Sequence, residues 1–267
     1  MNDFLLQNEP TLRLSAFIGV IATMMLWELA APCRRYEIPR LIRWLNNLAL
    51  VVLDTAILRL AFPLLAVGLA AIAQERGWGL LNSIELPGWA EFTIAFLLLD
   101  FAIYLQHVIF HHVPVLWRFH RMHHADLDFD TTTGIRFHPV EIVISMGIKL
   151  ALVTALGAPP VAVLVFEVVL NATSLFNHGN VSLGKLDRTV RTLIVTPDMH
   201  RVHHSSVRQE TDSNFAFNFS FWDRLCGTYR AQPAAGHDAM EIGLERFRDR
   251  REAWLHRMLI QPLIGRP

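Results

Sequence analysis

Residues 90–124 read AEFTIAFLLLDFAIYLQHVIFHHVPVLWRFHRMHH, an apolar run that leads directly into histidine-rich sequence. The apolar part is long enough to form a helix through the hydrocarbon core of a bilayer, which is about 30 Å thick. Two histidine clusters follow, HxxxH at residues 107–111 and HxxHH at residues 120–124. The stretch therefore predicts a membrane helix that carries metal-binding imidazoles to one of its ends.

The rest of the chain has the composition of a membrane protein. Hydrophobic residues make up 52% of the 267 residues, and the mean hydropathy is positive. Further apolar runs cover residues 14–31, 45–73 and 140–176. We expect the second to kink at Pro63 and the third to break into a hairpin at its Gly-Ala-Pro-Pro sequence. The sequence predicts an all-α integral membrane bundle with about four to five transmembrane or membrane-inserted helices.

The chain is predicted to form one membrane domain in three parts. Residues 1–90 hold the N-terminal spans, residues 91–230 the catalytic region, and residues 231–267 a polar tail with a charged, helix-like segment at 241–257. The basic residues after the first span are Arg34, Arg35, Arg40 and Arg43. By the positive-inside rule they place this end of the bundle, with a histidine-rich metal-binding cap, on the cytoplasmic side.

A second HxxHH cluster lies at residues 200–204. Residues three and four apart share a helical face, so each cluster can aim two or three imidazoles at one point. Eight histidines exceed one ordinary site, and two metals are the economical interpretation. The histidine clusters meet only if an even number of crossings separates them, and the hairpin supplies two. The predicted ligands are His107, His111, His120, His123, His124, His200, His203 and His204, with His178 as a ninth.

Four other residues are candidates for binding metal or for orienting a ligand. His138 stands where the chain re-enters the membrane, so a structural role competes with ligation. Asp100 and Tyr104 share a helical face with His107; Asp100 either accepts an imidazole proton, pairs with an arginine or makes an interhelical contact. Asp198 either caps its helix or orients a ligand. Glu141 and Glu167 stay open, and His237 and His256 are expected to be ordinary tail residues.

Several functional classes are disfavoured by the composition. The 24 basic and 24 acidic residues cancel, so no basic excess points to nucleic acid. Cys33 and Cys226 show no CxxC spacing and predict neither a disulfide framework nor a thiolate metal site. The zincin motif HExxH is absent from the sequence, which weighs against metal-dependent hydrolysis.

Residues 100–229 resemble the fatty acid hydroxylase and sterol desaturase superfamily of integral membrane di-iron proteins. The motifs that carry the resemblance are HxxxH at 107–111, LWRFHRMHH at 116–124, RFHP at 136–139, NH at 177–178 and TPDMHRVHH at 196–204. The resemblance implies that the nine histidines hold two iron ions, with no catalytic residue separate from the metal site. Two departures are Val108, where family members often have arginine, and His178, which stands alone where some hydroxylases have a further HxxxH.

The resemblance also implies an activity. The expected enzyme is an oxidoreductase that uses dioxygen to hydroxylate or desaturate a lipid-like substrate, such as a sterol or a fatty acyl chain, drawn from among membrane lipids. Because no haem or flavin domain is attached, electrons are expected from a separate ferredoxin- or cytochrome-type carrier with its reductase. The alternatives are a non-redox metal-dependent membrane hydrolase, a metal carrier, and a catalytically inactive metal-binding relative.

Overall fold

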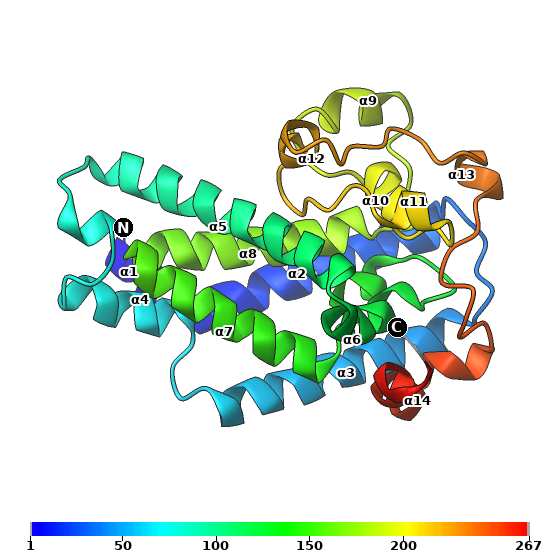
Figure 1. Cartoon of the computed structure of the whole chain (residues 1–267), viewed down its shortest axis with the longest axis horizontal. Helices are drawn as coiled ribbons and strands as arrows, with labels where there is room; N and C mark the ends of the chain where they lie inside the picture. The colour runs from blue at the N-terminus through cyan, green and yellow to red at the C-terminus, as the bar shows by residue number, and fades with distance from the viewer. Residues whose placement is uncertain (1, 266–267) are drawn as a thin grey trace.

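The computed structural model describes residues 2–265 as a bundle of long helices with a polar cap at one end (Figure 1). Five helical stretches are long and apolar enough to cross a membrane. They are α2 (Glu9–Ala30), α3 (Arg40–Ala61) together with α4 (Ala66–Glu75), α5 (Gly88–His112), α7 (Pro139–Leu156) and α8 (Pro160–Asn177). Residues 2–265 contain two isolated β-bridges and no strand. The prediction of an all-α integral membrane bundle is confirmed.

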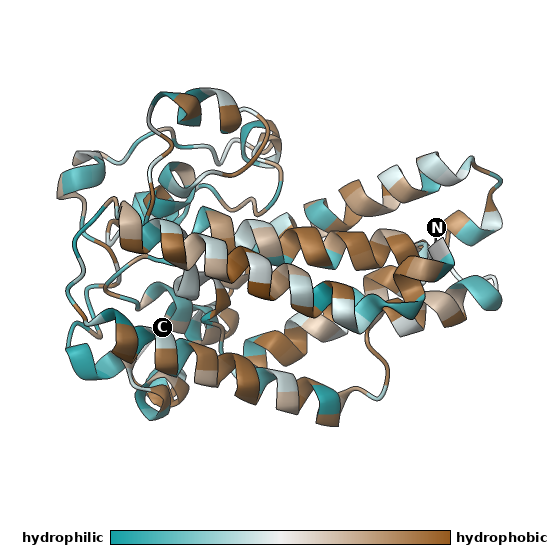
Figure 2. Ribbon diagram, turned by 180° about the vertical axis from the view of Figure 1, so that it is seen from behind, coloured by the Kyte–Doolittle hydropathy of each residue, from teal (hydrophilic) through white to brown (hydrophobic). Residues whose placement is uncertain are grey.

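Helix α8 is the central helix of the bundle. Half of its 18-residue apolar stretch is buried inside the protein, compared with 17% of the corresponding stretches of α2 and α7. It packs against α2, α4 and α5, and its Phe166 belongs to the main apolar core. The outer helices instead expose large apolar side chains such as Leu26, Val52 and Leu60. Figure 2 shows the same division, with hydrophobic residues along the helices and hydrophilic residues gathered at the cap.

The breaks between the helices follow the prolines and glycines. The kink expected at Pro63 separates α3 from α4. Between α7 and α8 the chain turns through Gly157, whose φ of 64° is in the left-handed region. A Cβ atom there would lie 2.6 Å from the carbonyl oxygen of Trp78, so the turn requires glycine. This turn makes the predicted hairpin, which returns the chain to the cap.

The cap is built from short elements between and after the long helices. Helix α6 (Pro114–His124) and the 3₁₀ helix η2 (Thr131–Ile135) lie between α5 and α7. The elements that follow α8 include α9 (Asp187–Val190), α10 (Pro197–His203), α11 (Arg208–Thr211) and α12 (Phe221–Leu225). Because α5 and α8 both end at the cap, all three histidine clusters meet there (Figure 1).

The prediction of a helix-like tail over residues 241–257 is wrong for most of that segment. Residues 241–249 are not helical, and only η4 (Arg250–Ala253) and α14 (Leu255–Ile260) are. Gly243 and Phe247 have φ values of 96° and 65°, which interrupt a right-handed helix. The tail is nevertheless docked, because Met258 is fully buried in an apolar cluster with α3 and α6 side chains.

Candidate metal centre

The nine histidines predicted as ligands lie in two buried groups at the cap end of the bundle. One ligand atom from each member of a group lies within 4.8 Å of those of all the others. The five-histidine group comprises His107, His111, His120, His124 and His203. The four-histidine group comprises His123, His178, His200 and His204. Every one of these side chains is at most 4% exposed.

Each HxxHH cluster serves both groups, whereas the sequence analysis expected each cluster to address one point. In α6, His120 and His124 enter the five-histidine group and His123 the four-histidine group. In α10 the division is reversed, with His203 entering the five-histidine group. Adjacent residues of an α-helix are about 100° apart, so the third histidine of each motif faces away from the second. Two copies of HxxHH on facing helices therefore build two neighbouring sites.

The Nε2 atoms of several imidazoles point at one another, but they carry no protons with which to form hydrogen bonds between them. His107 Nε2 lies 3.0 Å from His203 Nε2. The Nδ1 atoms of these two residues face the carbonyl oxygens of Phe215 and Ser213, at 2.7 Å each. A carbonyl oxygen only accepts, so both Nδ1 atoms carry the proton and both Nε2 atoms present lone pairs to each other. Such an arrangement is unfavourable unless a cation lies between them.

The four-histidine group repeats this arrangement. His178 Nε2 lies 3.2 Å from His123 Nε2, while their Nδ1 atoms donate to the carbonyl oxygens of Ser174 and Arg136. His200 Nε2 is 3.0 Å from His178 Nε2. The Nδ1 atoms of His200 and His204 have no hydrogen-bond partner among the described residues. Converging imidazole lone pairs are suited to iron, copper, nickel or zinc.

Burial lowers the pKa of most of the grouped histidines and so favours their neutral form. Burial lowers the pKa of His203 to about 3, and the nearby His120 and His178 contribute to this shift. Burial also lowers the pKa of His178 to about 3. Burial and then the neighbouring imidazoles hold the pKa values of His123, His124, His200 and His204 well below the usual range. Neutral imidazole is the form that binds metal.

Aromatic rings surround the two groups and separate them from water. The Trp117 ring lies 4.8 Å from His111, and the Phe215 ring lies 5.0 Å from the same imidazole. On the other side, the Phe129 ring is 5.1 Å from His204. Trp117, Phe129 and Phe215 are each at most 8% exposed. A dry, apolar surrounding of this kind protects reactive chemistry from solvent.

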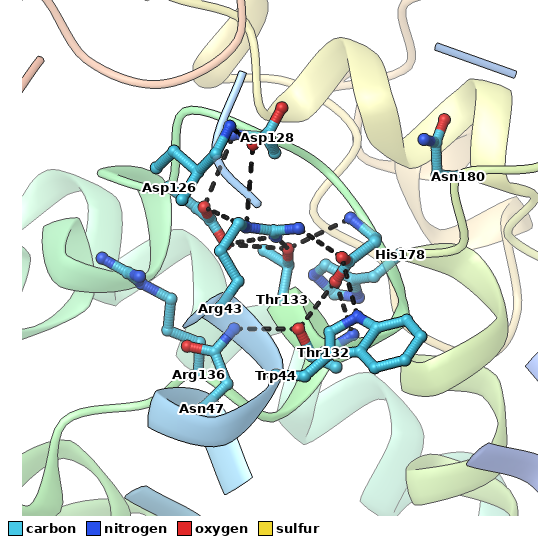
Figure 3. Close-up of polar contacts among 12 residues, drawn as sticks. Arg43, Trp44, Asn47, Asp126, Asp128, Thr132, Thr133, Arg136, His178 and Asn180 are labelled. Atoms are coloured by element: carbon cyan, nitrogen blue, oxygen red, sulfur yellow. Dashed lines mark hydrogen bonds and ion pairs between the residues drawn. The ribbon is translucent and has the colours of Figure 1, made fainter. Parts of the chain in front are cut away.

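A buried ion-pair network lies next to His178 of the four-histidine group (Figure 3). The fully buried Arg43 guanidinium binds Asp126 through Nη2 at 2.7 Å and also contacts Asp130. Burial would raise the pKa of Asp126, but Arg43 and other donors hold it below its usual range. Arg43, one of the basic residues expected after the first span, thus lies inside α3 and links that helix to the loop after α6.

The loop that Arg43 anchors packs directly on His178. Asp130 caps η2 by accepting from the backbone N–H of Thr132 at 2.9 Å. A Cβ atom at Gly134, within η2, would lie 3.0 Å from His178 Nδ1 and 2.6 Å from the carbonyl oxygen of Ser174. The loop therefore approaches α8 so closely that only glycine fits, and it confines the His178 imidazole.

The four further candidates lie outside both groups. His138 caps α7, because its Nδ1 accepts from the N–H of Val140 at 3.1 Å. Asp100 accepts from Trp222 Nε1 at 2.8 Å, which matches the expected alternative of an interhelical contact. The remaining contacts are Tyr104 Oη with Thr228 Oγ1 at 3.0 Å and Asp198 with Arg201 at 2.6 Å. Asp198 does not cap α10, since that role belongs to Thr196.

The two glutamates left open by the sequence have different roles. Glu141 Oε1 accepts from His120 Nδ1 at 2.7 Å, so it orients a member of the five-histidine group. Glu167 contacts Arg13 and binds Lys149 Nζ at 2.7 Å, which ties α2, α7 and α8 together within the bundle. Asp212, which the sequence analysis missed, has its Oδ1 3.1 Å from His111 Nδ1.

The fold and these two groups define a histidine-rich membrane protein with the side chains for two metals. The sequence model of the fatty acid hydroxylase family matches residues 92–228, which is about half of the chain and contains all nine histidines. The chain belongs to the fatty acid hydroxylase family. No solved structure gives a significant match.

Several known proteins are similar to this chain over about half of its length. Ornithine lipid hydroxylase OlsE of Rhizobium tropici is 30% identical over 151 residues, which cover 56% of this chain and 44% of the relative. Human alkylglycerol monooxygenase is 34% identical over 149 residues, which cover 54% of this chain and 31% of the relative. Human cholesterol 25-hydroxylase is 30% identical over 136 residues, which cover 50% of this chain and 49% of the relative. The chain thus spans less than half the length of each of these relatives.

Proposed function

We propose that this protein is a membrane-bound di-iron oxygenase that hydroxylates a lipid-like substrate. The observation that carries the proposal is the pairing of unprotonated Nε2 atoms, such as those of His107 and His203 at 3.0 Å, in each of two adjacent buried groups. A cation in each group relieves that repulsion. The five-histidine group would hold one iron and the four-histidine group the other.

The protein's own residues fix the site and keep it dry. The acceptors of the Nδ1 protons, such as Glu141 and the Ser213 carbonyl, hold each imidazole in one tautomer and turn its Nε2 inward. The rings of Trp117 and Phe129 exclude water. When bound, the irons would supply the activation of dioxygen that oxidation of an apolar C–H bond needs, chemistry for which no amino-acid side chain is suited.

The side chains beside the site favour this chemistry over hydrolysis. A metal-dependent hydrolase needs a carboxylate or other base free to activate water. Two carboxylates among the described residues contact the groups, Glu141 and Asp212, and each has one oxygen engaged with an imidazole Nδ1 atom. They are therefore better suited to orient ligands than to take a proton from water.

The substrate class is inferred from the relatives and from the bundle. The three relatives named above are hydroxylases or monooxygenases, and their names indicate an ornithine lipid, an alkylglycerol and cholesterol as substrates. These share an apolar portion and dissolve in membranes, and they favour hydroxylation over desaturation here. Arg34 and Arg35 at the cap end support a cytoplasmic site. Electrons would come from a separate ferredoxin- or cytochrome-type carrier.

The proposal is tested by oxygenation of lipids by the purified protein. Protein loaded with iron in detergent is supplied with reductant, dioxygen labelled with heavy oxygen, and each of a panel of ornithine lipids, alkylglycerols, fatty acids and sterols. The expected result is a hydroxylated product with the label, formed by wild-type protein and not by His203→Ala. Label-free hydrolysis products, or equal yields from both proteins, would contradict the proposal.

A further inference from the structure

Three of the five imidazoles in the five-histidine group are held by one short segment of the cap, residues 212–215, here called the acceptor strip. Asp212 Oδ1 lies 3.1 Å from His111 Nδ1. The Ser213 carbonyl accepts from His203 at 2.7 Å and the Phe215 carbonyl accepts from His107 at 2.7 Å. These histidines come from α5 and α10, so one strip fixes the imidazoles of two helices.

The strip can serve three imidazoles only because its backbone is turned at Asn214. This residue has a φ of 53°, in the left-handed region where asparagine is tolerated better than most residues. Its fully buried side chain donates to the carbonyl oxygens of Met199 and Arg230 at 2.9 Å each. Its Oδ1 accepts from the Arg230 N–H at 2.8 Å. The side chain thus ties the turn to α10 and to the chain after α12.

Asp223 holds the other end of the strip from α12. Its Oδ1 accepts from the Phe215 N–H at 2.7 Å, and its Oδ2 accepts from the Ala216 N–H at 3.0 Å. Thr228 Oγ1 donates to the same carboxylate at 2.7 Å. Asp223 is completely buried. A buried carboxylate that satisfies two consecutive backbone N–H groups leaves the Phe215 carbonyl pointing the opposite way, toward His107.

We propose that Asp223 and Asn214 are positioning residues for the five-histidine group, holding the acceptor strip so that it orients His107, His111 and His203. The inference rests on the proposed function, since it assumes that the group binds a metal. It is specific to that group. In the four-histidine group, His123 and His178 donate to the carbonyls of Arg136 and Ser174, outside the strip.

The test is a titration of the metal-free full chain in detergent with iron(II) alone, and in parallel with cobalt(II). Asp223→Asn keeps the size of the side chain but turns one oxygen into an N–H donor that faces a backbone N–H. The expected result is a loss of about 10- to 100-fold in affinity for one of the two metals and none for the other. The matched control is Asp187→Asn, which alters a buried carboxylate paired with Arg191 in the same part of the cap.

The cobalt spectrum identifies which group loses its metal. Asp223→Asn carrying a single cobalt should have the visible spectrum of His107→Ala, in which the four-histidine group alone is filled, and not that of His178→Ala. Asn214→Gly, which retains the backbone conformation without the side-chain bonds, should behave in the same way and serves if Asp223→Asn does not fold.

Three outcomes overturn the inference. Wild-type affinity for both metals in Asp223→Asn and Asn214→Gly would show that the strip does not need these residues. An equal weakening of both metals, or the same loss in Asp187→Asn, would assign the effect to general loosening of the cap. If wild-type protein bound no metal, the proposed function would fail first, and the inference with it.

Discussion

The two histidine groups are neighbours made from the same helices, yet they are supported in different ways. The five-histidine group is held by hydrogen-bond acceptors that contact its imidazoles, including Glu141 and Asp212. Among the described residues, the four-histidine group contacts backbone acceptors, and a buried charge network around Arg43 fixes the adjacent loop. The five-histidine group is thus stabilised by direct hydrogen bonds to its imidazoles, and the four-histidine group by a loop that packs on it. The groups should therefore fail under different perturbations.

The largest difference is expected from two adjacent residues of α6. His123→Ala removes a member of the four-histidine group and His124→Ala a member of the five-histidine group. Each variant should lose turnover and bind the metal of its own group more weakly while the other metal stays bound, because one imidazole is missing from that group alone. Metal analysis and the spectra of the cobalt-loaded variants measure this.

His112→Ala is the matched control, because His112 is exposed, belongs to neither group, and has its hydrogen bond to the Val108 carbonyl within its own helix. Its ring also lies 6.0 Å from the Phe215 ring, so the variant tests whether that contact matters. It should keep both metals and full activity. Identical spectra for the two α6 variants would contradict the assignment of these histidines to separate groups.

The next effect is expected at Arg43. Arg43→Met leaves Asp126 and Asp130 buried without their cation, and removal of one partner from a buried pair costs about 3–5 kcal/mol. The melting temperature in detergent should fall, and the metal of the four-histidine group should be lost first. The double variant Arg43→Met with Asp126→Asn should recover part of the loss. A variant that loses the other metal first would reverse the comparison.

Acid should destabilise the metal-free protein through the buried histidines of both groups, of which His178 and His203 give one example each. The pKa values of His178 and His203 are depressed to about 3 in the folded protein, while an unfolded histidine has a pKa of about 6.5. The unfolded chain therefore binds more protons below pH 6.5, and stability falls as the pH is lowered from there toward 3. The loss between pH 6.5 and 5.0 is about 2 kcal/mol for each residue. Melting temperatures across this range test the slope, and a flat profile would contradict it.

The smallest effect is expected at His138, which touches neither group. His138→Ala removes the cap of α7 and should cost about 1 kcal/mol of stability. Both metals should stay bound, as measured by metal analysis after purification. Loss of either metal would return His138 to the candidate ligands.

The sequence predicted much of this architecture because its signals are periodic. The long apolar runs, the break at Gly157 and the three histidine clusters all depend on spacing along the chain. The sharing of each HxxHH between two groups follows from helical geometry only once α6 and α10 are known to face each other. That arrangement is part of the tertiary structure. The sequence therefore predicted which histidines belong to the site, but not which of the two groups each one joins.

The supporting residues were harder to find, because their roles depend on distant partners. Arg43 has the sequence environment of a loop cation, and its partners lie more than eighty residues away. The alternation of Asp126, Asp128 and Asp130 was a usable signal for a buried cation. The acceptor strip gives no sequence signal, since two of its three contacts use backbone carbonyls. The tail helix was predicted wrongly because the charged composition of residues 241–257 gives no signal of the positive φ values at Gly243 and Phe247.

The most direct test of the account is the metal content of the chain purified in detergent under reducing, oxygen-free conditions with iron supplied. Two adjacent groups of converging imidazoles predict about two irons per chain. His107→Ala and His178→Ala should each bind one of the two irons more weakly, at different groups. Zinc in place of iron, or a single metal in wild-type protein that both variants lose, would contradict a di-iron centre.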